Sequence, residues 1–99
     1  MVLEVKAGLF KALGDPYRLR IIESLESEVR CNCHLQDLLG LASNHLSYHL
    51  KVLRQAGLIV GQRRGRWVDY SITSEAKHLI ESALPSFNVV TTPHSDPDC

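Results

Sequence analysis

The sequence predicts one mainly helical domain with a single β-hairpin, and two adjacent stretches carry this prediction. Residues 29–56 have the pattern of a short helix, a tight break after Gly40 and a longer helix, which is a helix-turn-helix. Residues 58–72 follow as two β-rich runs around a loop that contains glycine. The predicted fold is therefore a winged helix-turn-helix, and its apolar first helix predicts a dimer.

That first helix is expected over residues 2–13. Apolar residues surround it on nearly all sides, so it must be buried, and in a chain this small we expect burial against a partner subunit. Asp15 is then a good N-cap, and Pro16 suits the first position of a second helix, which runs to about residue 28. The end of each of these two helices is thus marked in the sequence.

The later elements are marked in the same way. Within the helix-turn-helix, Gly40 ends the short helix, and the longer helix covers residues 43–56. The hairpin is expected from residues 58–60 and 67–72, with "GQRRGR" as the loop between them. A last helix spans residues 74–84. These elements divide the chain into a folded domain, 1–84, and a flexible C-terminal tail, 85–99.

Composition and charge limit the possible functions. The 99 residues are 44% apolar and 22% charged, as in a globular domain with a modest core. No run is long enough to cross a membrane and no secretory signal is evident, so we expect a cytoplasmic protein with reduced thiols. Net charge is zero, yet residues 30–70 hold six Lys or Arg against two acids. This basic segment indicates a nucleic-acid partner.

Three strings identify a family resemblance. "LFKALGDPYRLRII", "HLSYHLKVLRQAGLI" and "RRGRWVDYSI" resemble the ArsR/SmtB family of metal-sensing bacterial repressors, in the same order and spacing over about residues 5–84. The resemblance implies a homodimer joined through the first and last helices. It also implies operator DNA that is bound by the fourth helix and the wing and is released when an effector binds. We expect no enzymatic activity, because neither a phosphate-cradling loop nor a histidine–acid pair near the thiols is evident.

The side chains expected at the DNA come from the fourth helix and the wing. A recognition helix presents its outward side chains to base edges, while basic residues hold phosphates. His49 is either a family position or simply a packed histidine, and Ala42 stands where the family often has serine, so we expect Ser43 to cap the helix. The predicted DNA-binding residues are Ser43, Asn44, His45, Ser47, Tyr48, Lys51, Arg63, Arg64 and Arg66.

Two of the three cysteines, Cys31 and Cys33, lie one residue apart near the start of the third helix. In the arsenic- and cadmium/lead-sensing branches of the family this helix begins with Cys-x-Cys, so the resemblance implies a metal site here. Side chains two positions apart on a helix point about 200° apart. Both thiolates therefore reach one ion only if the first turn is unwound, or if Cys31 lies before it.

The expected effector is a thiophilic ion, because thiolates are soft ligands. We expect As(III) or Sb(III), with Cd(II), Pb(II) or Zn(II) as alternatives. As(III) takes three sulfurs, and Gln36 stands where the arsenic branch can have a third cysteine, so we predict Cys99 as the third metal ligand. His34 and His94 are substitutes suited to zinc or cadmium. Two other interpretations of the pair stay open, namely core packing and a labile redox disulfide.

Overall fold

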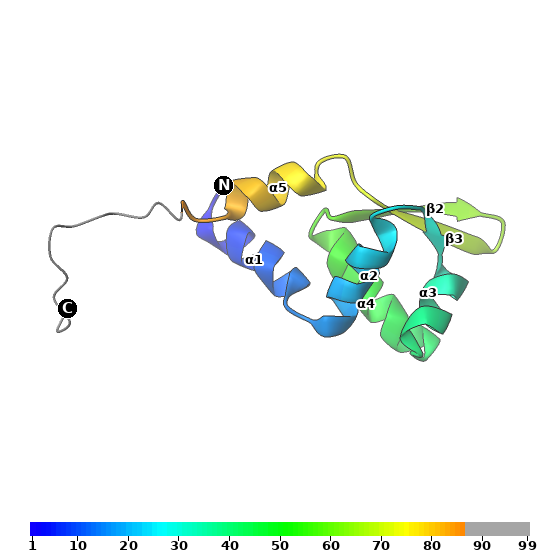
Figure 1. Cartoon of the computed structure of the whole chain (residues 1–99). Coiled ribbons are helices and arrows are strands. Elements are labelled where there is room, and N and C mark those ends of the chain that lie inside the picture. The colour runs from blue at the N-terminus through cyan, green and yellow to red at the C-terminus, as the bar shows by residue number, and fades with distance from the viewer. Residues whose placement is uncertain (87–99) are drawn as a thin grey trace, which may run out of the picture.

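The computed structural model describes residues 1–86 and confirms the winged helix-turn-helix (Figure 1). In chain order its elements are α1 (Leu3–Leu13), α2 (Pro16–Leu25), β1 (Arg30–Cys31), α3 (Asn32–Leu39), α4 (Ser43–Gln55), β2 (Ile59–Arg64), β3 (Trp67–Ile72) and α5 (Ala76–Ala83). Helices α1 and α5 lie side by side at one end, and the β2–β3 hairpin lies with α3 at the other (Figure 1). Nearly all of the predicted tail falls outside the described residues.

The core lies among the helices and against one face of the sheet. Ile21 of α2, Leu35 of α3 and Leu53 of α4 are fully buried, together with Leu58 at the start of the hairpin. From the sheet, Tyr70 of β3 points into the same cluster. Burial of each large aliphatic side chain contributes about 1.5–3 kcal/mol, so these contacts fix the helix-turn-helix against the base of the wing.

The predicted end signals act as expected. The Asp15 carboxylate caps α2 by accepting hydrogen bonds from the backbone N–H groups of Tyr17 (2.8 Å) and Arg18 (3.2 Å). Gly40 ends α3 in the left-handed conformation, with φ of 64°, which a glycine adopts at little cost. However, α2 ends at Leu25 rather than near residue 28, because the chain must turn there to enter β1.

Strand β1 was not predicted. Its two residues, Arg30 and Cys31, pair antiparallel with Tyr70 and Asp69 of β3, so the strand order of the sheet is β1-β3-β2. A two-residue strand has no period that a sequence could reveal, and it forms only because β3 offers a free edge. As a result, α3 begins at Asn32 rather than at residue 29.

The wing is longer than predicted. Strands β2 and β3 pair from Ile59↔Ile72 to Arg64↔Trp67, so the connecting loop is only Gly65 and Arg66. The prediction of a loop over residues 61–66 was therefore wrong. A two-residue hairpin loop requires positive φ at its centre, and Gly65 meets this requirement with φ of 62°.

A buried arginine joins three of the helices. The Arg18 Nε donates to the carbonyl oxygen of Ala12 (2.6 Å), and Nη2 donates to that of Lys11 (3.2 Å), at the end of α1. Its Nη1 donates to Nδ1 of His49 on α4 (3.0 Å). Nδ1 is thus an acceptor and cannot also donate to Asp15, whose Oδ1 is 4.0 Å away. His49 is a packed histidine, with a side chain that is 12% exposed.

We predict that Arg18→Met lowers the free energy of unfolding by about 1–3 kcal/mol, because it leaves the Ala12 and Lys11 carbonyls without their partner. Urea unfolding followed by circular dichroism measures this. Arg20→Met, an exposed position on the same helix, is the matched control and should change stability by less than about 0.5 kcal/mol. Equal effects of the two substitutions would contradict the assigned role of Arg18.

Candidate metal and DNA-binding sites

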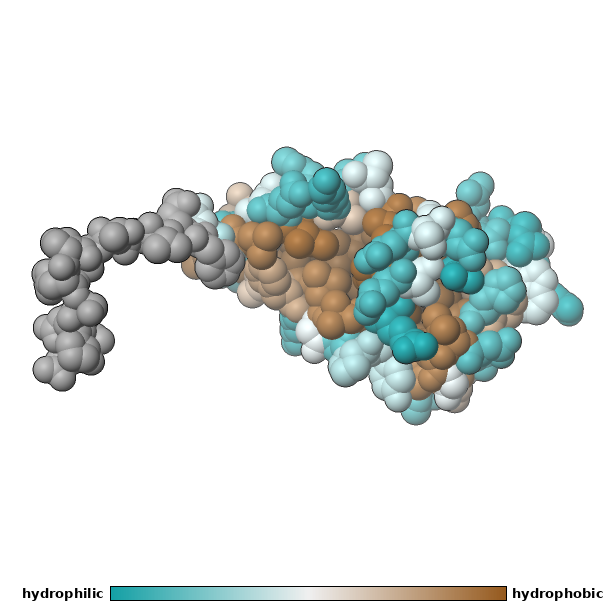
Figure 2. Space-filling view, in the orientation of Figure 1, coloured by the Kyte–Doolittle hydropathy of each residue, from teal (hydrophilic) through white to brown (hydrophobic). Residues whose placement is uncertain are grey.

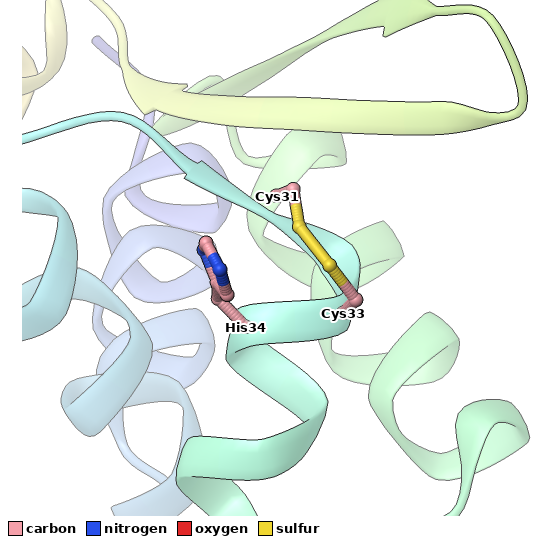
Figure 3. A group of neighbouring side chains, drawn as sticks. All are labelled: Cys31, Cys33 and His34. Atoms are coloured by element: carbon pink, nitrogen blue, oxygen red, sulfur yellow. A yellow bond between two sulfur atoms is a disulfide. The ribbon is translucent and has the colours of Figure 1, made fainter.

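The thiol pair lies where β1 passes into α3 (Figure 3). Cys31 is extended, with φ of −80° and ψ of 160°, and occupies the N-cap position of α3, while Cys33 lies in its first turn. Of the two arrangements that let both sulfurs reach one ion, the structure thus has Cys31 before the helix. The Cα atoms are 5.4 Å apart, and the two sulfurs are joined as a disulfide (Figure 3).

His34 completes a group of three donors. The sulfurs of Cys31 and Cys33 and a ring nitrogen of His34 all lie within 4.8 Å of one another (Figure 3). Cys31 is buried, Cys33 is half-buried and His34 is exposed, so the group opens to solvent on the His34 side. Once reduced, this donor set suits a thiophilic or borderline ion. The other two predicted ligands, Cys99 and His94, lie outside the described residues.

The site adjoins the wing rather than the core. Cys31 is 6% exposed yet does not belong to the core cluster. Directly paired residues share a face of a sheet and neighbours alternate, so Cys31 lies on the face of Asp69, opposite to that of Tyr70. Between the cysteines, Asn32 accepts a hydrogen bond from the Val68 N–H through Oδ1 (3.2 Å). The thiol pair is therefore tied to β3 at two neighbouring positions.

Asp69 also carries an ion pair of the wing. Arg64 donates to both of its carboxylate oxygens, from Nε at 2.8 Å and from Nη2 at 3.1 Å. These hydrogen bonds hold the pKa of Asp69 below its ordinary value, against desolvation, which raises it, and the charges of Arg64 and His34 lower it further. The same hydrogen bonds raise the pKa of Arg64.

The predicted base-reading side chains are all exposed. They project from α4, which places Ser43, Asn44, His45, Ser47, Tyr48 and Lys51 in contact with solvent. The expectation that Ser43 caps this helix was wrong. Ala42 is the N-cap, in an extended conformation and without a side-chain hydrogen bond, so Ser43 is the first helical residue. The start of α4 is therefore set by the turn after Gly40 and not by a capping side chain.

The three wing arginines are exposed but have different surroundings. Arg63 and Arg64 are neighbours on β2, so their side chains point to opposite faces of the hairpin. Arg64 is held by Asp69, and the guanidinium of Arg66 lies 4.9 Å from the centre of the Trp67 ring. Within residues 1–86, Arg63 makes no side-chain hydrogen bond or ion pair, which leaves its charge available.

Sequence reasoning missed two residues of this region, Asn32 and Asp69. Neither residue was assigned a role from the sequence, because their contacts arise from strand pairing. Asn32 meets Val68 through the pairing of β1 with β3, and Asp69 meets Arg64 through the pairing of β2 with β3. An asparagine between two cysteines could have been noticed. Its partner, a backbone N–H of the wing, could not.

Comparison with known proteins identifies the family. Residues 15–60 match the model of the bacterial regulatory proteins of the arsR family. The HTH-type transcriptional regulator MJ1325 of Methanocaldococcus jannaschii is 37% identical over 80 residues, which are 79% of this chain and 90% of that protein. The chain belongs to the arsR family. The ArsR/SmtB resemblance is thus confirmed, and membership in a family of transcriptional regulators also confirms that the chain is not an enzyme.

Further relatives and structures agree. The arsenical resistance operon repressor of Bacillus subtilis is 39% identical over 67 residues, and SmtB of Mycobacterium tuberculosis is 33% identical over 84 residues. These cover 67% and 84% of this chain, which spans only 64% and 62% of those two proteins. Rv0081 of M. tuberculosis superposes with a TM-score of 0.70 at 38% identity, covering 81% of this chain and 82% of that one.

Reduced HlyU from Vibrio cholerae superposes with a TM-score of 0.68 at 32% identity, and the match covers 80% of this chain and 85% of that one. These likenesses confirm the winged helix-turn-helix. Among residues 1–86, no helix is long and apolar enough to cross a membrane.

We predict that Asp69 titrates below its ordinary pKa in the native chain and that Arg64→Gln raises this pKa. Because folding lowers the pKa, the pair stabilises the fold above the unfolded pKa, about 3.9, and this contribution is lost as pH falls through the lower folded value. NMR titration of the side-chain carboxyl carbons measures the shift. Lys77→Gln on α5 is the control and should leave Asp69 unchanged.

Proposed function

We propose that this chain is a cytoplasmic homodimeric repressor that releases operator DNA when a thiophilic ion binds Cys31 and Cys33. The observation that carries the proposal is the position of the thiol pair, at the first residues of the helix-turn-helix and against the wing strand. An ion there acts on the elements that would contact DNA. Family membership supplies the class of partner, and the site supplies the class of effector.

The proposed dimer interface is the end formed by α1 and α5. Large apolar side chains are exposed there in the single chain, and Figure 2 shows an apolar area over α1. Such a patch on a small domain is typical of a subunit interface. These residues are Met1, Val2, Leu3, Val5 and Phe10 near or on α1, and Leu84 after α5. A two-fold symmetric dimer then binds a two-fold symmetric operator.

The proposed DNA surface is the opposite end. The exposed side chains of α4 would meet base edges in the major groove, and Lys51 a phosphate. Arg63, Arg64 and Arg66 would follow the flanking minor groove or backbone. Of the three, Arg63 is the most available to a phosphate, because Arg64 forms an ion pair with Asp69 and Arg66 lies over the Trp67 ring.

For the effector we favour As(III) or Sb(III), with Cys31, Cys33 and Cys99 as the three sulfurs. The likeness to the arsenical resistance operon repressor of B. subtilis supports this choice. The position of His34 within 4.8 Å of both thiols supports the alternatives, since two sulfurs and one nitrogen suit Zn(II) or Cd(II) better than As(III), and Pb(II) shares their preference for thiolates.

A second candidate is a thiol-redox-responsive repressor of the same fold. The observation that favours it is the disulfide between Cys31 and Cys33. The similar structure of HlyU from V. cholerae is of a protein in its reduced state, so the redox state is also a variable in that relative. Oxidation removes both thiolates, so the disulfide form binds no ion. To separate the two candidates, the DNA affinity of the reduced chain is compared with that of the oxidised chain, without any ion present. A lower affinity of the oxidised chain would favour the redox candidate.

We predict that Cys31→Ser and Cys33→Ser each abolish release by the ion and leave DNA affinity unchanged. Neither cysteine is among the proposed DNA-binding residues, whereas both are needed to hold the ion. Titration of As(III), Cd(II), Pb(II) and Zn(II) into the reduced dimer on its own promoter DNA, followed by fluorescence anisotropy, measures release. If the double variant is released with unchanged ion affinity, the pair is not the sensor.

We predict a steep fall in DNA affinity with rising salt, and a flatter slope after Arg63, Arg64 and Arg66 are replaced with Gln. Each lost phosphate contact lowers the slope of log K against log salt by about 0.9. Lys77→Gln, on α5 at the other end of the chain, should keep the native slope. Binding that is insensitive to salt would refute the proposed DNA surface.

We predict that Cys99→Ser reduces the number of sulfurs around bound As(III) from three to two. X-ray absorption at the arsenic edge measures this on the reduced chain, with His34→Ala as the matched variant. A three-sulfur shell in both variants would rule out Cys99 as a ligand. Loss of Cd(II) affinity in His34→Ala alone would instead favour the nitrogen-containing site.

A further inference from the structure

The feature behind this inference is a side chain that continues the β1–β3 ladder. Arg30 pairs with Tyr70 and Cys31 with Asp69, so the next pair in register is Asn32 with Val68. The main chain of Asn32 has already entered α3 and no longer runs beside β3. Its side-chain Oδ1 accepts from the Val68 N–H instead, at 3.2 Å. Asn32 thus keeps the start of α3 attached to the wing.

Val68 and Asp69 are the two residues of β3 that lie opposite Asn32 and Cys31. Each is also linked to an arginine of β2. Val68 is the cross-strand partner of Arg63. Asp69 holds Arg64 through two hydrogen bonds. A change in how Cys31 and Asn32 meet β3 therefore changes the position of the cations that the proposed function places on DNA.

Asn32 is also the only residue between the two cysteines. Its two peptide units connect the Cα atoms of Cys31 and Cys33, which are 5.4 Å apart. Because a metal or metalloid centre fixes the distance and angle between its two sulfurs, binding constrains both cysteine side chains and the peptide units between them. The side chain of Asn32 turns when these peptide units turn, and its hydrogen bond to Val68 responds.

We propose that Asn32 is a positioning residue that couples the thiol site to the wing. Ion binding at Cys31 and Cys33 weakens the bond from Asn32 to the Val68 N–H, and the wing shifts away from its DNA-binding position. This inference rests on the proposed function, because it needs an ion at the thiol pair. It adds a route through the β1–β3 edge, next to the direct effect on α3 and α4. Two conformations of the wing, biased by the ion, are what such coupling requires.

The decisive variant is Asn32→Ala, which removes the acceptor and keeps both thiols. Two quantities are measured on the reduced, full-length chain. They are the affinity for arsenite, from thiolate–arsenic absorption, and the factor by which arsenite lowers affinity for promoter DNA. We expect a native factor of about 5–150, the usual range of such coupling, and a factor below about 2 in Asn32→Ala, with arsenite affinity within about threefold of native. A structural role alone would not remove the factor while arsenite affinity stays near its native value.

Two further variants sharpen the test. Asn32→Asp keeps an oxygen that accepts from Val68 and should restore most of the native factor. Thr73→Val removes a different side-chain hydrogen bond at the base of the wing, from Oγ1 to the Gly57 carbonyl (2.7 Å), and should keep the native factor. Should Asn32→Ala fail to fold, amide hydrogen exchange in the native chain replaces it. Arsenite should then speed exchange at Val68 and leave it unchanged at Ile72.

The outcomes separate this inference from the proposed function. If the native chain binds arsenite and leaves DNA, and Asn32→Ala does so by the same factor, the inference is overturned while the proposed function stands. Amide exchange at Val68 that arsenite leaves unchanged would likewise overturn the inference while the proposed function stands. If neither arsenite nor Cd(II), Pb(II) or Zn(II) releases the native chain from DNA, the proposed function fails and the inference fails with it.

Discussion

The pairing of two residues of β1 with β3 is the contact on which both sites depend. It keeps Cys31 extended up to the first residue of α3, and in that position its sulfur reaches that of Cys33. In a continuous helix the two side chains would point about 200° apart. The same pairing brings the thiols next to the strand that carries the wing. A pair of backbone contacts therefore creates both the geometry of the proposed sensor site and its proximity to the proposed DNA surface.

The rest of the fold fixes the position of the β1–β3 edge relative to α1 and α5, the proposed dimer interface. Arg18 ties the last carbonyls of α1 to His49 on α4, so the proposed recognition helix is fixed to the proposed interface helix. Leu35, Leu53 and Leu58 then bury α3, α4 and the base of the wing in one core. In a symmetric dimer, the spacing of the two recognition helices would be set through this chain of contacts. Movement is easier at β1, which pairs with β3 through only two residues.

The sequence allowed prediction of the features that depend on local chemistry. Asp15 before Pro16 and Gly40 after a leucine-rich turn mark helix ends through their own side chains or backbone freedom, and both were placed correctly. Features that depend on distant partners escaped prediction. β1 exists because β3 has a free edge, and β2 extends to Arg64 because a two-residue turn at Gly65 lets the strands pair further. The Cys-x-Cys pair was found, but its link to the wing through Asn32 was not.

Specificity and response are separable in this arrangement. In the proposed site, the third donor, a sulfur or the nearby His34, would decide which ion binds, since soft and borderline ions differ in what they accept beside two thiolates. In the proposed mechanism, the response is carried by the peptide units between Cys31 and Cys33, on which any change of partner at the sulfurs acts. Oxidation to a disulfide and ligation of an ion both act on these same units. A family built on this edge could therefore change its effector by replacing one ligand, without rebuilding the path from the thiols to DNA.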